Sequence, residues 1–139
     1  MIAFIGDNGG ALLRGKVTLY AKGLHVPLIM AHPGLNKPGQ QVSSNVSGED
    51  HAPTILGVAG ITIPKEMTGI RLVPAFQNPS FEPHDYVFAV RGGHCFGLPT
   101  NTSNFDPGRT VFTKKYKLIY NTLWQLTYHP VTLHLNISG

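Results

Sequence analysis

The sequence predicts an α/β fold, and three observations support that prediction. Met1 to Ile5 is an apolar run without alternation, which is typical of a strand buried on both faces of a parallel sheet. Residues 50–60 carry the clearest helix pattern of the chain. Residues 110–120 have the pattern of a hairpin, and closely spaced strands without an intervening helix imply antiparallel pairing.

Composition indicates a folded protein with a core of its own. The chain has 139 residues, of which 42% are hydrophobic and 13% charged, and this excludes the disordered class. The net charge of +4 comes without a long basic run, so a nucleic-acid partner is not expected. The single cysteine, Cys95, excludes an internal disulfide and is expected to be an ordinary buried or loop residue. No apolar run reaches membrane-spanning length, and the N-terminus lacks the features of a signal peptide.

The first predicted strand ends in Asp7-Asn8-Gly9-Gly10, and Lys16 follows in a Gly-Lys-x-Thr setting. In an open parallel sheet, ligands bind outside the carboxyl ends of the strands, which is where Asp7 and Asn8 would lie. Their carboxylate and amide oxygens are hard donors that suit Ca²⁺ or Mg²⁺, and the Lys16 ammonium could hold an anion. The alternative is a plain turn with a solvated lysine, because Asp, Asn and Gly are common turn residues.

Residues 50–60 are expected to form a helix that packs in the core and carries no chemistry. Asp50 is the predicted N-cap, Pro53 falls in the first turn, and Gly60 is predicted to end the helix. The apolar residues recur at helical spacing and predict the buried face: Ala52, Ile55, Leu56 and Ala59.

Four further strands are predicted outside this helix. Residues 24–30 form the first of them, and Pro27 marks either an edge strand or the start of a strand. Residues 86–90 form a second. The hairpin has arms at 110–113 and 116–120 and turns at Lys114-Lys115.

Several segments resemble one family in order and spacing. They are Asp7-Asn8-Gly9-Gly10, Leu13-Arg14-Gly15-Lys16-x-Thr18-x-Tyr20, Gly23-Leu24-x-Val26-Pro27, Asp50-x-x-Pro53-Thr54-Ile55-Leu56 and Arg109-Thr110-Val111-x-Thr113-x-Lys115-Tyr116-Lys117. This pattern is similar to the formylglycine-dependent sulfatases, and most of all to the heparan N-sulfatase (sulfamidase) branch. The resemblance implies a fragment of an alkaline-phosphatase-like α/β sheet domain. Residues 1–76 would be the C-terminal part of that catalytic domain, and 77–139 a partial antiparallel C-terminal subdomain.

The resemblance implies that Asp7 and Asn8 are two ligands of a single divalent cation, normally Ca²⁺, and that Lys16 contacts the sulfate oxygens. The family makes its nucleophile, formylglycine, from Cys/Ser-x-Pro/Ala-x-Arg. Cys95 stands in Cys-Phe-Gly-Leu-Pro and does not match. The nucleophile and the remaining ligands are therefore expected in an N-terminal part that this chain lacks, and the chain alone is expected to have no sulfatase turnover.

Arg91, His94 and Arg109 are candidate contacts for a sulfated or carboxylated sugar. The alternative is a solvated loop. Around Lys16 the chain departs from the family, because His25 replaces an arginine and Ala21-Lys22 replaces Glu-Gly. These departures put in doubt how closely the loop around Lys16 is braced. The family implies a sulfated carbohydrate as partner and a periplasmic, secreted or lysosomal location.

Two other functions stay open at this point. A phosphodiesterase or phosphonate hydrolase of the same superfamily would use the same fold. A non-catalytic remnant or sugar-binding module would have Asp7 and Asn8 only as a turn. For a fragment, the first strand would leave its faces and at least one edge open, so the isolated chain is expected to aggregate, oligomerise or be only partly ordered.

Overall fold

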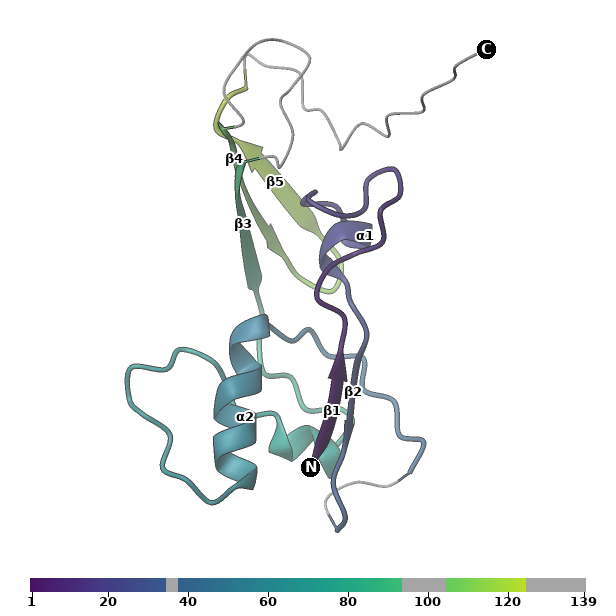
Figure 1. The fold of residues 1–139 in the computed structure, drawn as a ribbon, viewed down its shortest axis with the longest axis vertical. Coiled ribbons are helices and arrows are strands. Elements are labelled where there is room, and N and C mark those ends of the chain that lie inside the picture. Colours follow the sequence, from purple (N-terminus) through teal and green to yellow (C-terminus); the bar gives the residue numbers. More distant parts are fainter. Residues whose placement is uncertain (35–37, 94–104, 125–139) are drawn as a thin grey trace. The chain divides into compact units, whose positions relative to one another are not determined.

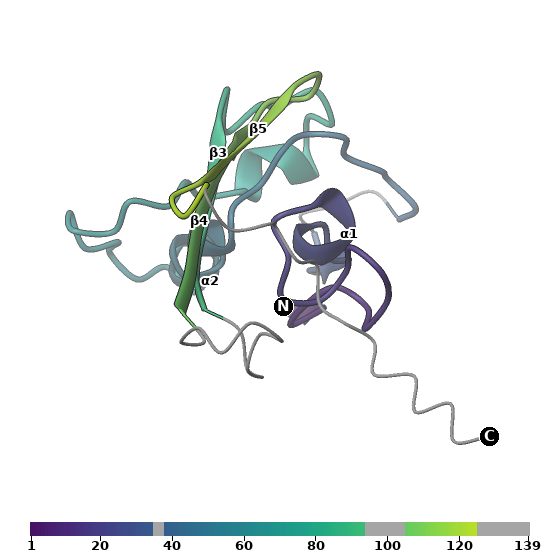
Figure 2. The same ribbon diagram turned by 90° about the horizontal axis from the view of Figure 1, so that it is seen from above.

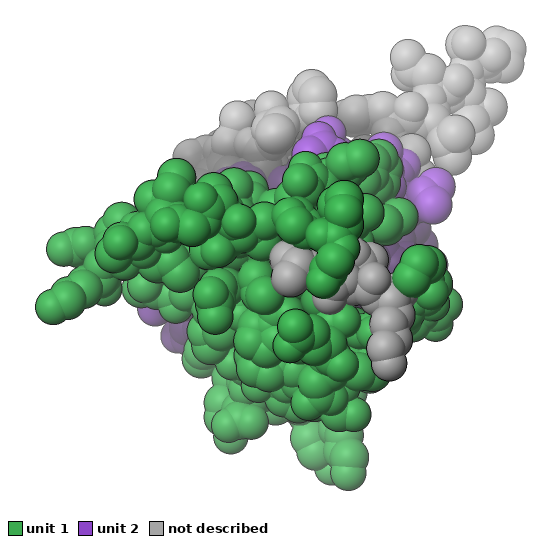
Figure 3. Space-filling model, turned by 90° about the horizontal axis from the view of Figure 1, so that it is seen from below, with its two compact units in different colours: residues 1–4, 29–88, 112–116 green, residues 5–28, 89–111, 117–139 purple. Residues whose placement is uncertain are grey.

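The computed structural model describes residues 1–34, 38–93 and 105–124, which combine short helices with two small sheets (Figure 1). The described residues fall into two compact units (Figure 3). Unit 1 comprises residues within 1–4, 29–88 and 112–116, and unit 2 those within 5–28, 89–111 and 117–139. The α/β class is confirmed, and the domain boundary at 76/77 stays a prediction. No described helix is long and apolar enough to cross a membrane.

Strands β1 (Ile2–Ile5) and β2 (Leu28–Ala31) form a two-stranded sheet. Gly6, just after β1, donates its N–H to the carbonyl of Pro27, just before β2, at 3.1 Å. The end of one strand therefore lies beside the start of the next, so the pair is antiparallel. The start of β2 directly after Pro27 confirms that proline as the start of a strand.

Two predictions about these strands were wrong. All four residues of β1 are exposed, with Ile2 at 74% and Phe4 at 58%, because in the described residues β1 pairs only with β2 and no layer covers either face. The second strand was predicted from residue 24, but residues Ala21–Leu24 form a single helical turn, α1. The N–H groups of Gly23 and Leu24 both donate to the carbonyl of Tyr20.

Unit 1 contains the 3₁₀ turns η1 (Gly48–Asp50) and η2 (Val73–Phe76) and the helix α2 (His51–Val58). Gly60 ends α2 as predicted. It has φ +71°, and the N–H of Ile61 donates to the carbonyl of Leu56 at 2.9 Å, which is a Schellman motif. The predicted buried face was wrong. Ile55 is 48% exposed and Ala52 is exposed, whereas Pro53 and Thr54 are buried.

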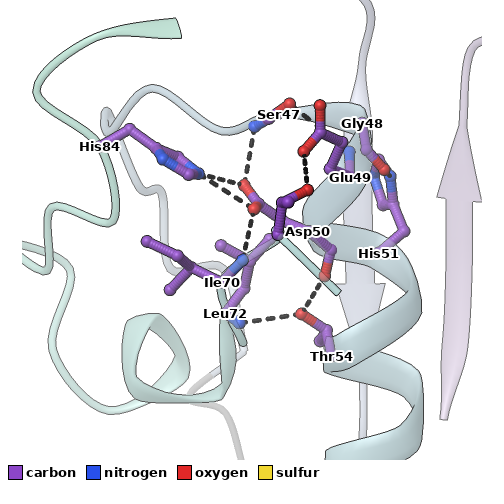
Figure 4. A network of polar contacts seen from close by, with 10 residues as sticks. Ser47, Gly48, Glu49, Asp50, His51, Thr54, Ile70, Leu72 and His84 are labelled. Carbon is purple, nitrogen blue, oxygen red and sulfur yellow. Dashed lines mark hydrogen bonds and ion pairs between the residues drawn. The ribbon is translucent and has the colours of Figure 1, made fainter. Parts of the chain in front are cut away.

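Asp50 does not cap α2 with its side chain, contrary to the prediction. The residue is fully buried, and its carboxylate accepts hydrogen bonds from three places (Figure 4). The donors are the N–H of Ser47 at 2.7 Å, the N–H of Ile70 at 2.8 Å and Nε2 of His84 at 2.8 Å. A buried carboxylate needs such donors, and two of them come from residues far along the chain.

Thr54 extends this network by one turn of α2. Its hydroxyl donates to the carbonyl of Asp50 at 2.6 Å and accepts from the N–H of Leu72 at 2.8 Å. The buried face of α2 is therefore polar in part. Hydrogen bonds from Ile70 and Leu72 to Asp50 and Thr54 hold residues 70–72 against the start of the helix.

Strands β3 (Val87–Gly93), β4 (Phe105–Phe112) and β5 (Lys117–Asn121) form a three-stranded sheet in that order (Figure 2). The predicted hairpin at Lys114-Lys115 is confirmed. The N–H of Thr113 donates to the carbonyl of Tyr116 at 2.8 Å, and the Thr113 hydroxyl accepts from the N–H groups of Lys115 and Tyr116. A threonine at this position thus closes the turn without glycine.

Candidate functional site

The predicted site residues Asp7, Asn8 and Lys16 all lie on one segment, residues 6–27, which joins β1 to β2 and includes α1. We call this segment the glycine loop. The glycine loop is cross-linked by its own backbone. The N–H of Lys16 donates to the carbonyl of Gly10 at 2.8 Å, and the N–H of Gly9 donates to the carbonyl of Gly23 at 3.3 Å. These bonds bring the segment after β1 against the segment before β2.

Glycines allow this close packing of backbone on backbone. A Cβ atom at Gly9 would lie 1.9 Å from the carbonyl oxygen of Lys22, and one at Gly15 would lie 2.1 Å from that of Gly10. Neither distance is possible for a real side chain. Gly10 is different, because its nearest neighbour would be 4.0 Å away. Gly9 and Gly15 are therefore required by close approach, and Gly10 is not.

The side chains of Asp7, Asn8 and Lys16 are exposed on this loop. The Asn8 amide nitrogen donates to the carbonyl of Gly9 at 3.1 Å, which leaves the amide oxygen as an acceptor. One carboxylate and one amide oxygen fit Ca²⁺ chemically, but Ca²⁺ takes six to eight oxygen ligands. Within the described ranges no group of three or more His, Cys, Asp or Glu could hold a metal ion. Asp7 and Asn8 thus fit as part of a cation site.

Two residues beside Lys16 have a left-handed backbone. Arg14 has φ +59° and Val17 has φ +65°. The guanidinium of Arg14 lies 5.2 Å from the centre of the Tyr20 ring, a cation–π distance. For a β-branched residue such as Val17, a positive φ is a genuine outlier, so the surrounding structure must hold it.

Two residues of the three-stranded sheet that belong to unit 2 contact the glycine loop just after Lys16. Arg91, on β3 and only 8% exposed, donates from Nη1 to the carbonyl of Val17 at 3.3 Å. Lys117, on β5, donates from Nζ to the carbonyl of Leu19 at 3.2 Å. Leu19 itself is 1% exposed. Arg91 is therefore not part of a solvated loop, which was the alternative for this residue.

The structure does not bring Arg91 and Arg109 together. A Cβ atom at Gly108 would lie 4.0 Å from Nη2 of Arg91, so Gly108 shares the face of Arg91. Arg109 is the next residue of β4 and therefore points to the opposite face, where it is exposed. His94 and Cys95 lie outside the described residues. The role of the three in sugar binding stays a prediction.

Sequence reasoning missed Lys117, Val17 and Leu19 as parts of this site. Lys117 was seen only as one position of a family motif. No local pattern indicates a left-handed valine, and no spacing rule joins residues 17 and 91, which are 74 positions apart. Alternation along β3 and β5 predicts that Arg91 and Lys117 each face one side of the sheet, but not which loop lies there.

Lys117 gives unit 2 a specific pH dependence. Partial burial of the ammonium lowers the pKa of Lys117 below its ordinary value of 10.5. The charged form is therefore disfavoured by folding, and this cost is fully present below the lowered pKa. Stability should rise as the pH increases from the lowered pKa toward 10.5. We expect Lys117→Met to lose this rise in urea denaturation, whereas Lys115→Met, at an exposed turn position, keeps it. Equal slopes in the two variants would contradict the assignment.

Comparison with known proteins adds an independent observation. Residues 12–129 match the family described as N-sulphoglucosamine sulphohydrolase, C-terminal. The ulvan-active sulfatase of Formosa agariphila is 31% identical over 121 residues, which are 87% of this chain and 23% of that protein. The N-acetylglucosamine-6-O-sulfatase of Bacteroides thetaiotaomicron is 31% identical over 127 residues, 88% of this chain and 22% of that protein.

A solved protein structure is also similar to this chain. It is a protein in complex with its substrate D-glucosamine-2-N,6-O-disulfate, and it is similar with a TM-score of 0.60 and 26% sequence identity. The similarity covers 73% of this chain and 20% of that one. The chain therefore spans less than a quarter of the length of these relatives.

Proposed function

The chain belongs to the N-sulphoglucosamine sulphohydrolase C-terminal family, a sulfatase family, and from this premise we propose that it serves in the hydrolysis of sulfate from a sulfated sugar. The motif resemblance to sulfatases is confirmed by the family match. The relatives act, by their names, on ulvan and on sulfated N-acetylglucosamine. We infer a sulfated carbohydrate as the substrate class and, as in the family, a periplasmic, secreted or lysosomal place of action.

One observation supports roles for three particular residues. Asp7, Asn8 and Lys16 are all exposed on a loop whose backbone is locked by hydrogen bonds and by glycines that admit no side chain. A carboxylate and an amide oxygen on this loop would hold a divalent cation, expected to be Ca²⁺. When bound, the cation would supply positive charge to sulfate oxygens. The Lys16 ammonium would bind and orient the same anion as a point charge.

The chain supplies only part of such a site. The sequence contains no Cys/Ser-x-Pro/Ala-x-Arg segment from which formylglycine could be made, and the described residues offer two hard ligands at the loop. We propose that the nucleophile and the other ligands come from further polypeptide of the enzyme. The purified chain is then expected to release no sulfate from N-sulfated or 6-O-sulfated glucosamine. Measurable release would contradict this division of the site.

A chimera tests the chemistry directly. In the N-acetylglucosamine-6-O-sulfatase of Bacteroides thetaiotaomicron, this chain would replace the 127 matching residues. We expect the chimera to release sulfate from 6-O-sulfated N-acetylglucosamine. Asp7→Ala and Lys16→Met should each lower kcat/KM about a hundredfold, because each removes positive charge, directly or through the cation, from the reacting sulfate.

Lys22→Met is the matched control, because Lys22 is exposed on the same glycine loop but belongs to no part of the proposed site. It should leave kcat/KM unchanged. A folded chimera in which Asp7→Ala and Lys16→Met have no more effect than Lys22→Met would refute the proposed roles. It would favour a non-catalytic module with a plain turn at Asp7 and Asn8.

A further inference from the structure

Val17, directly after Lys16, has a strained backbone conformation. Its φ of +65° is a conformation that side chains branched at Cβ rarely adopt. Left alone, the valine would relax to a negative φ. The peptide plane between Lys16 and Val17 would then rotate, and the direction in which Lys16 leaves the loop would change with it.

Two long basic side chains hold the backbone at this position. The Arg91 guanidinium donates to the carbonyl of Val17 itself, and the Lys117 ammonium donates to the carbonyl of Leu19, two residues on. Both bonds have a charged donor, and at 3.3 and 3.2 Å they lie at the long end of the hydrogen-bond range, so they act together rather than singly. Arg91 and Lys117 come from β3 and β5, so the two bonds attach the loop to two different strands of one sheet.

Apolar packing fixes the same segment. Leu19 is 1% exposed, and its Cδ1 would lie 2.9 Å from a Cβ atom at Gly108. The absence of a side chain on β4 at that point gives Leu19 its place against the sheet. Thr18, between the two held carbonyls, is 3% exposed and donates from its hydroxyl to the carbonyl of Gly15 at 2.7 Å. The segment after Lys16 is thus held on both sides.

We propose that Arg91 and Lys117 are positioning residues for Lys16. They hold the carbonyl groups of Val17 and Leu19, and Val17 therefore keeps the left-handed conformation that sets the direction of Lys16. The inference rests on the proposed function for the meaning of the Lys16 direction. In this proposal the three-stranded sheet supports the glycine loop, which carries Lys16. The same two bonds would explain how the loop around Lys16 is held in place, although His25 and Ala21-Lys22 depart from the family pattern.

Amide hydrogen exchange on the chain itself tests this proposal without any turnover. The N–H of Lys16 is bonded to Gly10 and the N–H of Thr18 to Gly15, so both report on the loop. The N–H of Gly6, bonded to Pro27 in the same unit, serves as an internal reference. In Arg91→Met and in Lys117→Met, exchange at Lys16 and Thr18 should accelerate about tenfold or more, while Gly6 changes little.

Three variants separate positioning from general stability. Arg91→Lys retains a donor and should recover part of the protection. Val17→Gly removes the strain, because glycine adopts a positive φ freely, so adding Arg91→Met to it should accelerate exchange at Lys16 far less than in the parent chain. Lys115→Met, at an exposed position of the hairpin turn, should leave all three amides unchanged.

A uniform acceleration of all three amides, or an equal effect of Arg91→Met with and without Val17→Gly, would overturn the proposal. If Arg91→Met does not fold, the Lys117→Met result alone decides in the same way. Failure of the proposed function looks different. In that case the chimera lacks dependence on Lys16, while the local exchange pattern and its rescue by Val17→Gly persist.

Discussion

Asp50→Ala is expected to lower the free energy of unfolding of unit 1 by about 3–5 kcal/mol. The substitution leaves three donors without an acceptor: the N–H groups of Ser47 and Ile70, and Nε2 of His84. Since small domains have only about 5–15 kcal/mol in total, a large part of the stability of this unit would be lost. Urea denaturation followed by circular dichroism of α2 measures the change.

Two variants make the Asp50 result specific. Asp85→Ala removes an exposed carboxylate one residue from His84 and should change stability by less than about 0.5 kcal/mol. His84→Ala removes one donor but leaves the two backbone donors on Asp50, so its effect should lie between the other two. An Asp50→Ala protein with nearly parental stability would show that the network contributes little.

Gly9→Ala is expected to disrupt the glycine loop. Its Cβ atom would fall 1.9 Å from the carbonyl oxygen of Lys22 and 2.8 Å from Cα of Gly23, and both are backbone atoms that cannot rotate away. The strands on both sides of the loop would have to separate. We expect loss of the protected amides at Gly9 and Lys16, and in the chimera a loss of sulfatase activity as large as that of Lys16→Met. Hydrogen exchange and kcat/KM measure the two effects.

Gly10→Ala is the control, because it adds the same methyl group one residue away. Apart from its chain neighbours, no atom of the described residues would lie closer than 4.0 Å to the added Cβ atom, and the φ of Gly10 is not in the left-handed region. The substitution should be neutral, or should stabilise by up to about 1 kcal/mol through the unfolded state. Equal behaviour of Gly9→Ala and Gly10→Ala would contradict the close approach seen at Gly9.

Local patterns in the sequence predicted the elements whose causes are local. Gly60 ends α2 because a left-handed residue there satisfies the last carbonyls, and the sequence alone indicates this. The hairpin turn at Lys114-Lys115 was predicted from the strand pattern on both sides, although the threonine that closes it was not recognised. Pro27 marked the start of β2 because a proline has no N–H to give to a ladder.

Contacts between distant residues explain what the sequence did not reveal. Asp50 looked like a helix cap, but its partners Ile70 and His84 are 20 and 34 residues away, so local spacing could not identify them. The apolar stripe of α2 predicted Ile55 as buried, whereas the polar network selects the face of Thr54. Met1 to Ile5 has the pattern of a buried strand, but burial depends on neighbouring layers and not on the strand itself.

The candidate site also has a part that the sequence predicted and a part that it did not. Asp7, Asn8 and Lys16 were predicted from a motif, and the structure places them on one loop, which leaves their roles as proposals. The Arg91–Val17 and Lys117–Leu19 bonds could not be predicted, because the bonded residues are 74 and 98 positions apart in the sequence. Sequence motifs therefore indicated the candidate side chains, and only the structure showed which contacts hold the loop that carries them.

The Asp50 carboxylate also bears on how the length of this chain can vary. It fixes Ile70 and His84 to one point, and between them Leu72, Ala75 and Phe81 are held by hydrogen bonds to Thr54, Gln40 and Ser44. The exposed residues 77–80 are the part of this stretch that lies between two held points and outside the core. Lengthening a flexible loop with anchored ends costs little entropy, roughly 0.6 kcal/mol for each doubling. Insertions at residues 77–80 can therefore be accommodated while α2 keeps its contacts with residues 70–72.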